Sequence, residues 1–537
     1  MCRRNLVKLA FAAMLAAAAA CSPGSRSYDV VVTGGGASGV CAGIQAARSG
    51  ARTLILEEGP WLGGMLTSAG VSAIDGNYCL RSGIFGEFCD SLAARYGGYG
   101  ALKTGWVSNI LFEPRVGAEV LADMAAGEER LDVLYHAAVR AVEKRRRGWL
   151  VRTSSGDFRC RILVDCTELG DVARLCGARY RIGDEEGVVQ DMTYVITIRD
   201  YGEGADRTIA EPDGYRVSDY ADCCLNPLNS KDFEKGQPRW SPEMMLSYGR
   251  LPGGDVMLNW PVEANDYYAN VIDASPKERE EALRAAKNRA LGYLYFIQTE
   301  LGLRNWGIAE GEYPTEDGLP PIPYYRESRR IEGEARFTFE AAADPYGSGA
   351  PLYRTGIAVG DYPVDHHHYA NPKWRTLRRE WPAIPSFTVP AGTMIPLGVE
   401  DLIVAEKSIC TDSIVNGATR LQPVAMGLGQ AAGVMAAMAA LGRCRVRDLS
   451  VRRVQAALLD AGARIQPYLD LEPSDSGFAS LQRVGSAGAF RAEGRSGDWR
   501  GEMWLLDGHP GRADSVRALD DPGAFALQEI DWQGLPK

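Results

Sequence analysis

A short apolar run followed at once by a glycine-rich turn most constrains how this chain can fold. Tyr28–Thr33 (YDVVVT) is apolar and β-branched, which predicts a fully buried parallel strand. The turn Gly34–Gly39 (GGGASG) follows, and the small residues of 40–49 then predict a helix that ends at a glycine. A second apolar run at 53–56 predicts the next strand. These segments predict a β-α-β unit, the core of an α/β domain.

The glycines of this turn have the spacing that a dinucleotide requires. Gly34 permits a tight turn, Gly36 lets a pyrophosphate approach the backbone, and Gly39 lets the helix pack closely on the strand. Free N–H groups and a partial positive charge at the helix N-terminus attract the phosphates. The residues expected at the phosphates are Gly34, Gly36, Ala37, Ser38 and Gly39. A glycine-rich turn that packs without a nucleotide is the alternative.

An acidic residue at the end of the second strand supports the same site. Glu57 follows Gly39 by 18 residues, and its carboxylate can accept hydrogen bonds from the hydroxyls of an adenosine ribose. Glu58 is the competing choice for this contact. Both are therefore candidates for the adenosine end of the ligand.

Residues 131–166 contain three strand-like stretches, DVLYHAAV, AVEKRRRGWLVRT and SSGDFRCRILVDC. Turns are predicted at Arg147-Gly148 and Ser155-Gly156, and the last stretch returns to Asp165. A β-α-β unit followed by a three-stranded meander and a return strand resembles the FAD domain of the glutathione-reductase type more than a plain nicotinamide dehydrogenase domain. The resemblance makes FAD the expected cofactor.

Changes of composition along the chain indicate a discontinuous architecture. Residues 195–390 are dense in Trp, Tyr and Pro and show poor periodicity apart from a helix expected at Pro276–Leu301. A buried strand returns at 402–405, and Pro423–Leu441 predicts a small-residue helix. The expected fold class is α/β, with a glutathione-reductase-type, Rossmann-like FAD-binding domain and an inserted mixed α+β substrate or cap domain. The expected boundaries are 1–20 for a signal peptide, 28–195 and 390–445 for the FAD-binding domain, 196–389 for the cap and 446–537 for a C-terminal extension.

Four motifs resemble one family of flavoproteins, in the order that the family has them. They are 57–67 (EEGPWLGGMLT), 165–171 (DCTELGD), 326–333 (RESRRIEG) and 420–433 (RLQPVAMGLGQAAG). These stretches look like the FAD-dependent oxidoreductase family whose bacterial members are often labelled xanthan-lyase-like. One departure is Cys166-Thr167-Glu168, where the family usually has Ala-Thr-Gly. A glutamate there can change how the backbone passes the cofactor.

The resemblance implies further cofactor contacts. Asp171 can bond ribityl hydroxyls or the diphosphate edge, and the N-cap of a helix at 172–176 is its alternative role. The dipole of the 423–441 helix would stabilise negative charge on reduced flavin, and Arg420 can do so by its charge, while tight helix–sheet packing is the alternative. The expected contacts are Gly63, Gly64, Met65, Thr67, Asp171, Arg420, Gln422 and Gly429.

Three consecutive histidines supply the acid–base candidates. The family's Tyr-x-x-Asp-x-His pattern matches Tyr362, Asp365 and His367, with His366 as the other base. A histidine can take a hydroxyl proton as hydride leaves the carbon, and an aspartate can fix its tautomer. Arg329 is expected to hold substrate or stabilise reduced flavin, with surface ion pairing as the alternative. A metal site is not expected, because neighbours along an extended chain cannot all face one ion, and a polar loop without a catalytic task is the other alternative.

The N-terminus indicates export. A charged start and the apolar stretch Leu9–Ala20 end at Cys21, which resembles a bacterial lipoprotein signal whose cysteine carries the lipid. We expect a lipid anchor in the cell envelope as the only membrane contact, with ordinary secretion as the alternative. The formal net charge of −10 argues against a nucleic-acid partner. Export permits disulfides, but their pairing cannot be read from the sequence.

The function expected from these features is that of an exported FAD-dependent oxidoreductase. It takes hydride from a small organic substrate and passes the electrons to an acceptor that the sequence does not specify. Family context and compartment make a carbohydrate the expected substrate. One rival is an FAD-assisted glycan lyase that acts by transient oxidation and elimination. The other is a non-catalytic surface protein that binds glycans with a flavin fold.

Overall fold

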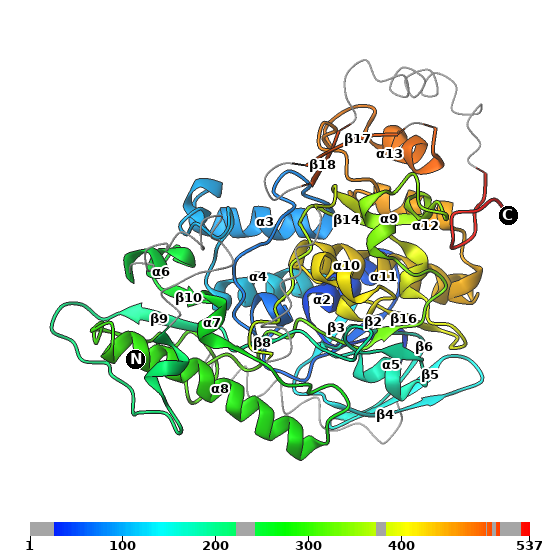
Figure 1. Ribbon diagram of the computed structural model, residues 1–537. Coiled ribbons are helices and arrows are strands. Elements are labelled where there is room, and N and C mark those ends of the chain that lie inside the picture. Colours follow the sequence, from blue (N-terminus) through cyan, green and yellow to red (C-terminus); the bar gives the residue numbers. More distant parts are fainter. Residues whose placement is uncertain (1–25, 222–241, 372–382, 490, 497–500, 505–527) are drawn as a thin grey trace, which may run out of the picture.

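The computed structural model describes residues 26–221, 242–371, 383–489, 491–496, 501–504 and 528–537 (Figure 1). The expected signal peptide, 1–20, and Cys21 lie outside these residues. Within them, a large hydrophobic core covers one face of a seven-stranded sheet, a smaller core covers its other face, and a further core packs on a three-stranded sheet.

The seven-stranded sheet has the strand order of the expected α/β fold. Parallel strands lie in the order β3 (Leu131–Leu134), β2 (Thr53–Leu56), β1 (Arg26–Thr33) and β6 (Gly156–Asp165). The second half of β6 pairs in parallel with β16 (Leu402–Val404). Its first half pairs antiparallel with β5 (Trp149–Thr153), which pairs with β4 (Val139–Lys144). The expected fold class is confirmed.

The segment 131–166 contains four strands instead of three. The first, β3, runs parallel beside β2, and the meander consists of β4, β5 and β6. The turns expected at Arg147-Gly148 and Ser155-Gly156 separate the strands of the meander. A local pattern predicts a strand but not its neighbour, so the place of β3 follows only from the tertiary fold.

Two helices cover one face of the large sheet. In β1, Val30 and Val32 point into the large core while Val31 points into a smaller core on the opposite face. α2 (Ala37–Arg48) and α11 (Gln422–Gly442) pack on the first face and on each other, near the centre of Figure 1. In the described part of the chain, α11 alone has the length and hydropathy of a membrane span, yet 83% of that window is buried inside the protein. It is therefore placed as a core helix.

The second core belongs to the segment expected as a cap. β9 (Ile196–Asp200) pairs antiparallel with β10 (Val256–Leu258) and β12 (Trp306–Ile308), and α8 (Pro276–Thr299) shares their core. α8 begins with a capping box between Ser275 and Glu278. The helix expected at Pro276–Leu301 is confirmed and ends two residues earlier. These elements lie together at the lower left of Figure 1.

The chain then returns to the large core. β14 (Gly356–Gly360) and β15 (Phe387–Pro390) pair with each other, and β14 packs against α11. The end of the 196–389 segment therefore shares the core of the large sheet. α12 (Val451–Asp460) and α13 (Phe478–Ala487), from the C-terminal segment, pack in the same core.

The remaining helices and strands of the described residues have the following bounds. They are η1 (Gly64–Leu66), α3 (Gly83–Tyr96), η2 (Tyr99–Leu102), α4 (Pro114–Ala126), α5 (Asp171–Leu175), β7 (Tyr180–Arg181), β8 (Met192–Thr193), η3 (Val217–Asp219), α6 (Pro242–Tyr248), α7 (Val262–Asn265), β11 (Asp266–Tyr267), β13 (Arg330–Ile331), α9 (Phe339–Ala343), η6 (Leu352–Thr355), η7 (Ala391–Met394), η8 (Glu406–Ser408), α10 (Ser413–Thr419), η9 (Val446–Asp448), β17 (Glu493–Ser496) and β18 (Gly501–Trp504).

Candidate active site

The turn between β1 and α2 leaves no room for side chains at two of its glycines. Gly34 has φ +83°, and a Cβ there would lie 2.5 Å from the backbone oxygen of Cys166. A Cβ on Gly39 would lie 1.8 Å from the backbone oxygen of Gly34. A Cβ on Gly36 would have its nearest neighbours in two glutamate side chains, at 3.4 and 3.7 Å. Position 36 therefore faces the carboxylates of two glutamates and not a backbone segment.

Glu57, and not Glu58, faces this turn. The Glu57 carboxylate accepts hydrogen bonds from the N–H groups of Gly35 and Gly59, both at 2.6 Å. Burial raises the pKa of Glu57 to about 7. The Glu58 side chain is exposed. Contact of either residue with a ribose stays a prediction.

The N-terminus of α2 holds an anion that belongs to the protein itself. The N–H and hydroxyl of Ser38 donate to Oε2 of Glu406, at 3.0 and 2.6 Å. The Lys407 ammonium lies 3.1 Å from Oε1 of Glu406 and 2.5 Å from Oε2 of Glu168. Spacing did not single out Glu406 or Lys407, because they follow β16, 368 residues after Ser38.

The loop after Glu57 approaches the turn through its backbone. Gly63 and Gly64 have φ +108° and +52°, and Gly63 forms a parallel bridge with Gly36. A Cβ on Gly64 would lie 2.5 Å from Oε1 of Glu168 and 2.8 Å from Cα of Gly36. Met65 is fully buried. The Thr67 hydroxyl donates to the Leu62 carbonyl at 2.6 Å, so it holds the loop closed.

At the start of α11, Gln422 anchors the loop around residue 75. Its amide donates to the Ala73 carbonyl at 2.9 Å and accepts from the Asp75 N–H at 3.2 Å. Gly429 lies further along the helix, where a Cβ would be 2.0 Å from the Ser38 carbonyl oxygen. The structure thus places Gly429 against α2, which favours its packing role over contact with a planar ring.

Arg329 lies with Asp171, apart from the histidines. Its guanidinium pairs with Asp171 at 2.6 Å and with Asp273 at 2.8 Å, and it is 1% exposed. Asp171 is the first residue of α5, whose N-cap is Gly170, so the alternative role of Asp171 as N-cap is wrong. The sequence could not show this arrangement, because Arg329 and Asp171 are 158 residues apart.

Asp165, and not Asp171, supplies the carboxylate that accepts hydrogen bonds at the start of α5. Its buried carboxylate accepts from the N–H and hydroxyl of Thr167, at 2.9 and 2.7 Å, and from the N–H of Ala173 at 2.5 Å. Burial raises its pKa to about 6, although these bonds favour the charged form. The Asp-x-Thr spacing was the local signal that could have revealed it.

His367 is held between two carboxylates. Its Nδ1 lies 2.7 Å from Oδ2 of Asp266, and its Nε2 lies 3.5 Å from Oδ2 of Asp365. Burial and the charge of Arg326 lower the pKa of His367, but the two carboxylates outweigh them and raise it. Asp266, in β11, is 2% exposed and precedes His367 by 101 residues, so the sequence did not reveal it.

Arg420 joins the histidine group through Asp365. Its Nη2 donates to Oδ2 of Asp365 at 3.0 Å, and its Nη1 donates to the Tyr324 hydroxyl. Burial opposes ionisation of Asp365, but the charges of His367 and Arg420 hold its pKa well below the usual range. The Asp365 side chain is 37% exposed, so water reaches it.

His366 and His368 face elsewhere. His366 Nε2 lies 2.9 Å from the Ile414 carbonyl, and its Nδ1 lies 3.1 Å from His368 Nε2. Burial lowers the pKa of His366 to about 4. Among the residues that the structure describes, no group of three or more His, Cys, Asp or Glu could hold a metal ion.

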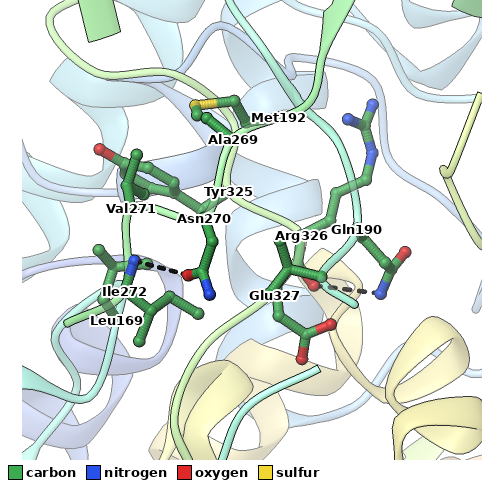
Figure 2. A pocket seen from close by; sticks show the side chains of 11 residues that line it. Leu169, Gln190, Met192, Ala269, Asn270, Val271, Ile272, Tyr325, Arg326 and Glu327 are labelled. Atoms are coloured by element: carbon green, nitrogen blue, oxygen red, sulfur yellow. Dashed lines mark hydrogen bonds between the residues drawn. The ribbon is translucent and has the colours of Figure 1, made fainter. Parts of the chain in front are cut away.

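Arg326 lies beside Asp266, the carboxylate that contacts His367. Its Nη1 lies 3.4 Å from Oδ1 of Asp266 and donates to the Thr193 hydroxyl at 2.7 Å. A cavity of about 10 Å³, room for one water, is lined by Arg326 together with Leu169 and Ile272. Figure 2 shows the Arg326 guanidinium pointing away from these two side chains. Gln190 donates to the Arg326 carbonyl at 3.3 Å. The Arg326 guanidinium therefore contacts Asp266, the partner of His367, and does not point into this cavity.

The chain matches the sequence profile described as FAD dependent oxidoreductase over residues 29–458. It belongs to that family. No curated protein sequence matches the chain significantly. Among solved structures, p-nitrophenol 4-monooxygenase PnpA from Pseudomonas putida DLL-E4 is 12% identical with a TM-score of 0.33, over 94% of this chain and 95% of that one.

Two further similar structures cover less of the protein. Thioredoxin reductase from T. acidophilum is 23% identical with a TM-score of 0.18, over 26% of this chain and 35% of that one. NikD, an unusual amino acid oxidase essential for nikkomycin biosynthesis, is 14% identical with a TM-score of 0.22, over 34% and 60%. The chain thus spans about a third and three fifths of their lengths. TM-scores below 0.5 carry no information on substrate.

FAD is the cofactor of this family of oxidoreductases, and the residues of the turn fit it. A carboxylate already binds the N–H and hydroxyl of Ser38, so these donors suit an anion such as a phosphate. Oε1 of Glu168 is buried beside Gly36 with no hydrogen-bond partner in the described part of the chain. This oxygen can accept a hydrogen bond from a hydroxyl group of the cofactor. Ser38, Glu57, Glu168 and the backbone of Gly63–Gly64 are the residues that would hold the nucleotide.

Proposed function

We propose that this flavoprotein oxidises a hydroxyl-bearing small molecule, with His367 as the proton acceptor. FAD, when bound, supplies the acceptor for the hydride of the substrate carbon. The observation that carries the proposal is the 2.7 Å contact between His367 Nδ1 and Asp266. A histidine that a buried carboxylate orients is well suited to act as a general base.

The contact with Asp266 decides which nitrogen reacts. In neutral His367, Nδ1–H donates to Asp266, which leaves the lone pair on Nε2. Nε2 has Asp365 at 3.5 Å, beyond a good hydrogen bond, and Asp365 borders accessible space. A substrate hydroxyl can therefore donate its proton to Nε2, while Arg420 fixes Asp365 beside it.

Buried polar atoms on residues that hydrogen bonds link to His367 or to Arg326 favour a substrate with several hydroxyl groups. Unpartnered donors are Nε and Nη2 of Arg326 and Nε of Arg420, and unpartnered acceptors are Oδ1 of Asp191 and Oδ1 of Asn416, within the described residues. Each costs about 1–3 kcal/mol if nothing satisfies it. Hydroxyl groups both donate and accept, so a carbohydrate or a similar polyol suits donors and acceptors together.

The compartment is part of the proposal. The stretch that ends at Cys21 favours export and a lipid anchor in the cell envelope. Cys21→Ser should move the protein from the membrane fraction to the soluble fraction. Retention of the variant in washed membranes would contradict the anchor.

Anaerobic reduction of the flavin tests the proposed chemistry. The full-length protein is loaded with FAD and mixed without oxygen with sugars, sugar acids, polyols and amines. We expect loss of the visible flavin absorption with one or more polyhydroxylated compounds. Reduction by amines alone would refute the assignment to alcohols, and a product with a new double bond and no reduced flavin would indicate a lyase.

A further inference from the structure

A buried carboxylate occupies the place where the α/β fold binds phosphates. Oε2 of Glu406 receives the N–H and the hydroxyl of Ser38 at the N-terminus of α2, a helix of 12 residues. The Glu406 side chain is fully buried. A helix N-terminus offers one set of free N–H groups, so a carboxylate and a pyrophosphate there compete for the same donors.

The backbone at Glu406 is held in a conformation that favours glycine. Glu406 has φ +58° and is the first residue of η8, two residues after the end of β16. A non-glycine residue in this region costs of order 1–3 kcal/mol and persists where surrounding contacts impose it. Those contacts are the bonds from Ser38 and the ion pair with Lys407 at 3.1 Å.

Lys407 and Glu168 complete a group of two carboxylates and one ammonium. The Lys407 ammonium is fully buried and lies 2.5 Å from Oε2 of Glu168. A Cβ on Gly36 would meet Oε1 of Glu168 at 3.4 Å and Oε2 of Glu406 at 3.7 Å. Both carboxylates therefore lie along the approach to Gly36, and the ammonium is the one positive side chain of this group.

We propose that Glu406 is an internal anion that closes the pyrophosphate position in the FAD-free protein and that FAD must displace. Lys407 then exchanges the carboxylate of Glu406 for the pyrophosphate as its ionic partner. The inference rests on FAD binding, which the proposed function also requires. It assigns Lys407 to the cofactor site and makes Glu406 a competitor of the cofactor.

Competition of this kind weakens the measured affinity for the ligand. The apparent dissociation constant equals the intrinsic constant divided by the fraction of molecules in which the position is open. A position that is closed in nine molecules of ten therefore raises the constant about tenfold. Removal of the Glu406 side chain should therefore tighten binding of FAD and also of ADP, which carries the same pyrophosphate.

The test is a titration of FAD-free, full-length protein with FAD, followed by quenching of flavin fluorescence, and with ADP, followed by calorimetry. Glu406→Gly removes the carboxylate and relieves the left-handed backbone, so it should fold. We expect it to bind both ligands at least tenfold more tightly than the unaltered protein. The double variant Glu406→Gly, Lys407→Met should bind FAD and ADP about tenfold more weakly than Glu406→Gly alone.

Asp401→Gly is the matched control. Asp401 also has a left-handed φ, of +60°, but its side chain pairs with Lys144 at the surface. The control should leave both affinities unchanged. Equal affinities of Glu406→Gly and the unaltered protein would overturn the inference alone. If neither the unaltered protein nor any variant binds FAD, both the proposed function and this inference are wrong.

Discussion

Gly39→Ala tests whether the turn is as tight as its geometry indicates. The added methyl carbon would lie 1.8 Å from the backbone oxygen of Gly34, well inside the 3.0 Å below which Cβ contacts are essentially not found. α2 cannot retreat, because α11 presses on its other side, where Gly429 already lies against Ser38. Overpacking costs about 1–3 kcal/mol, and a rigid backbone neighbour puts this variant at or above about 3 kcal/mol.

The assay is urea unfolding followed by tryptophan fluorescence, together with the FAD retained after desalting. Gly39→Ala should unfold at lower urea and retain little FAD. Gly127→Ala is the matched control, because Gly127 has φ −70° and the nearest atom to its Cβ would be 3.5 Å away. It should be neutral or more stable by about 0.4–1 kcal/mol. Equal unfolding midpoints for the two variants would refute the reasoning.

Three further predictions concern charged groups. Asp266→Asn removes a carboxylate that raises the pKa of His367. Because Nε2 accepts a proton only when the ring is neutral, the rate of flavin reduction should then rise at lower pH than in the unaltered protein. An unchanged pH profile would contradict the role of the His367–Asp266 pair. Lys407→Met leaves the buried carboxylates of Glu168 and Glu406 without their ammonium partner, so it should lower the free energy of unfolding in urea by about 3–5 kcal/mol. A loss below about 1 kcal/mol would contradict a buried ion pair at Lys407. Arg420→Lys should raise the substrate concentration for half-maximal reduction about tenfold, because an ammonium cannot reach both Asp365 and Tyr324; a KM equal to that of the unaltered protein would show that this bridge does not shape the site.

Local patterns were sufficient for the parts of the fold that local chemistry fixes. The glycine turn, the helix at Pro276 and the turns at Arg147-Gly148 and Ser155-Gly156 each depend on backbone conformations or caps that neighbouring residues determine. The Tyr-x-x-Asp-x-His pattern also predicted that Asp365 and His367 lie close together, because the two residues share a loop.

Pairings between distant segments were beyond the sequence. Asp266 orients His367 from a strand 101 residues away, and Glu406 reaches Ser38 across 368 residues. Within the segment 326–330, spacing could not show that Arg326 turns to Asp266 while Arg329 turns to Asp171 and Asp273. Such choices are made by tertiary packing, which places partners without leaving a local pattern.

The rate of flavin reduction in His367→Asn tests the central claim most directly. Asparagine can still donate to Asp266, but it lacks the basic Nε2, so the variant should keep its FAD and its fold. Mixed without oxygen with a substrate that reduces the unaltered protein, it should reduce its flavin about 10²–10⁴-fold more slowly. His136→Asn, at an exposed position with φ +57°, should react at the normal rate. Equal rates for the two variants would contradict proton transfer to His367.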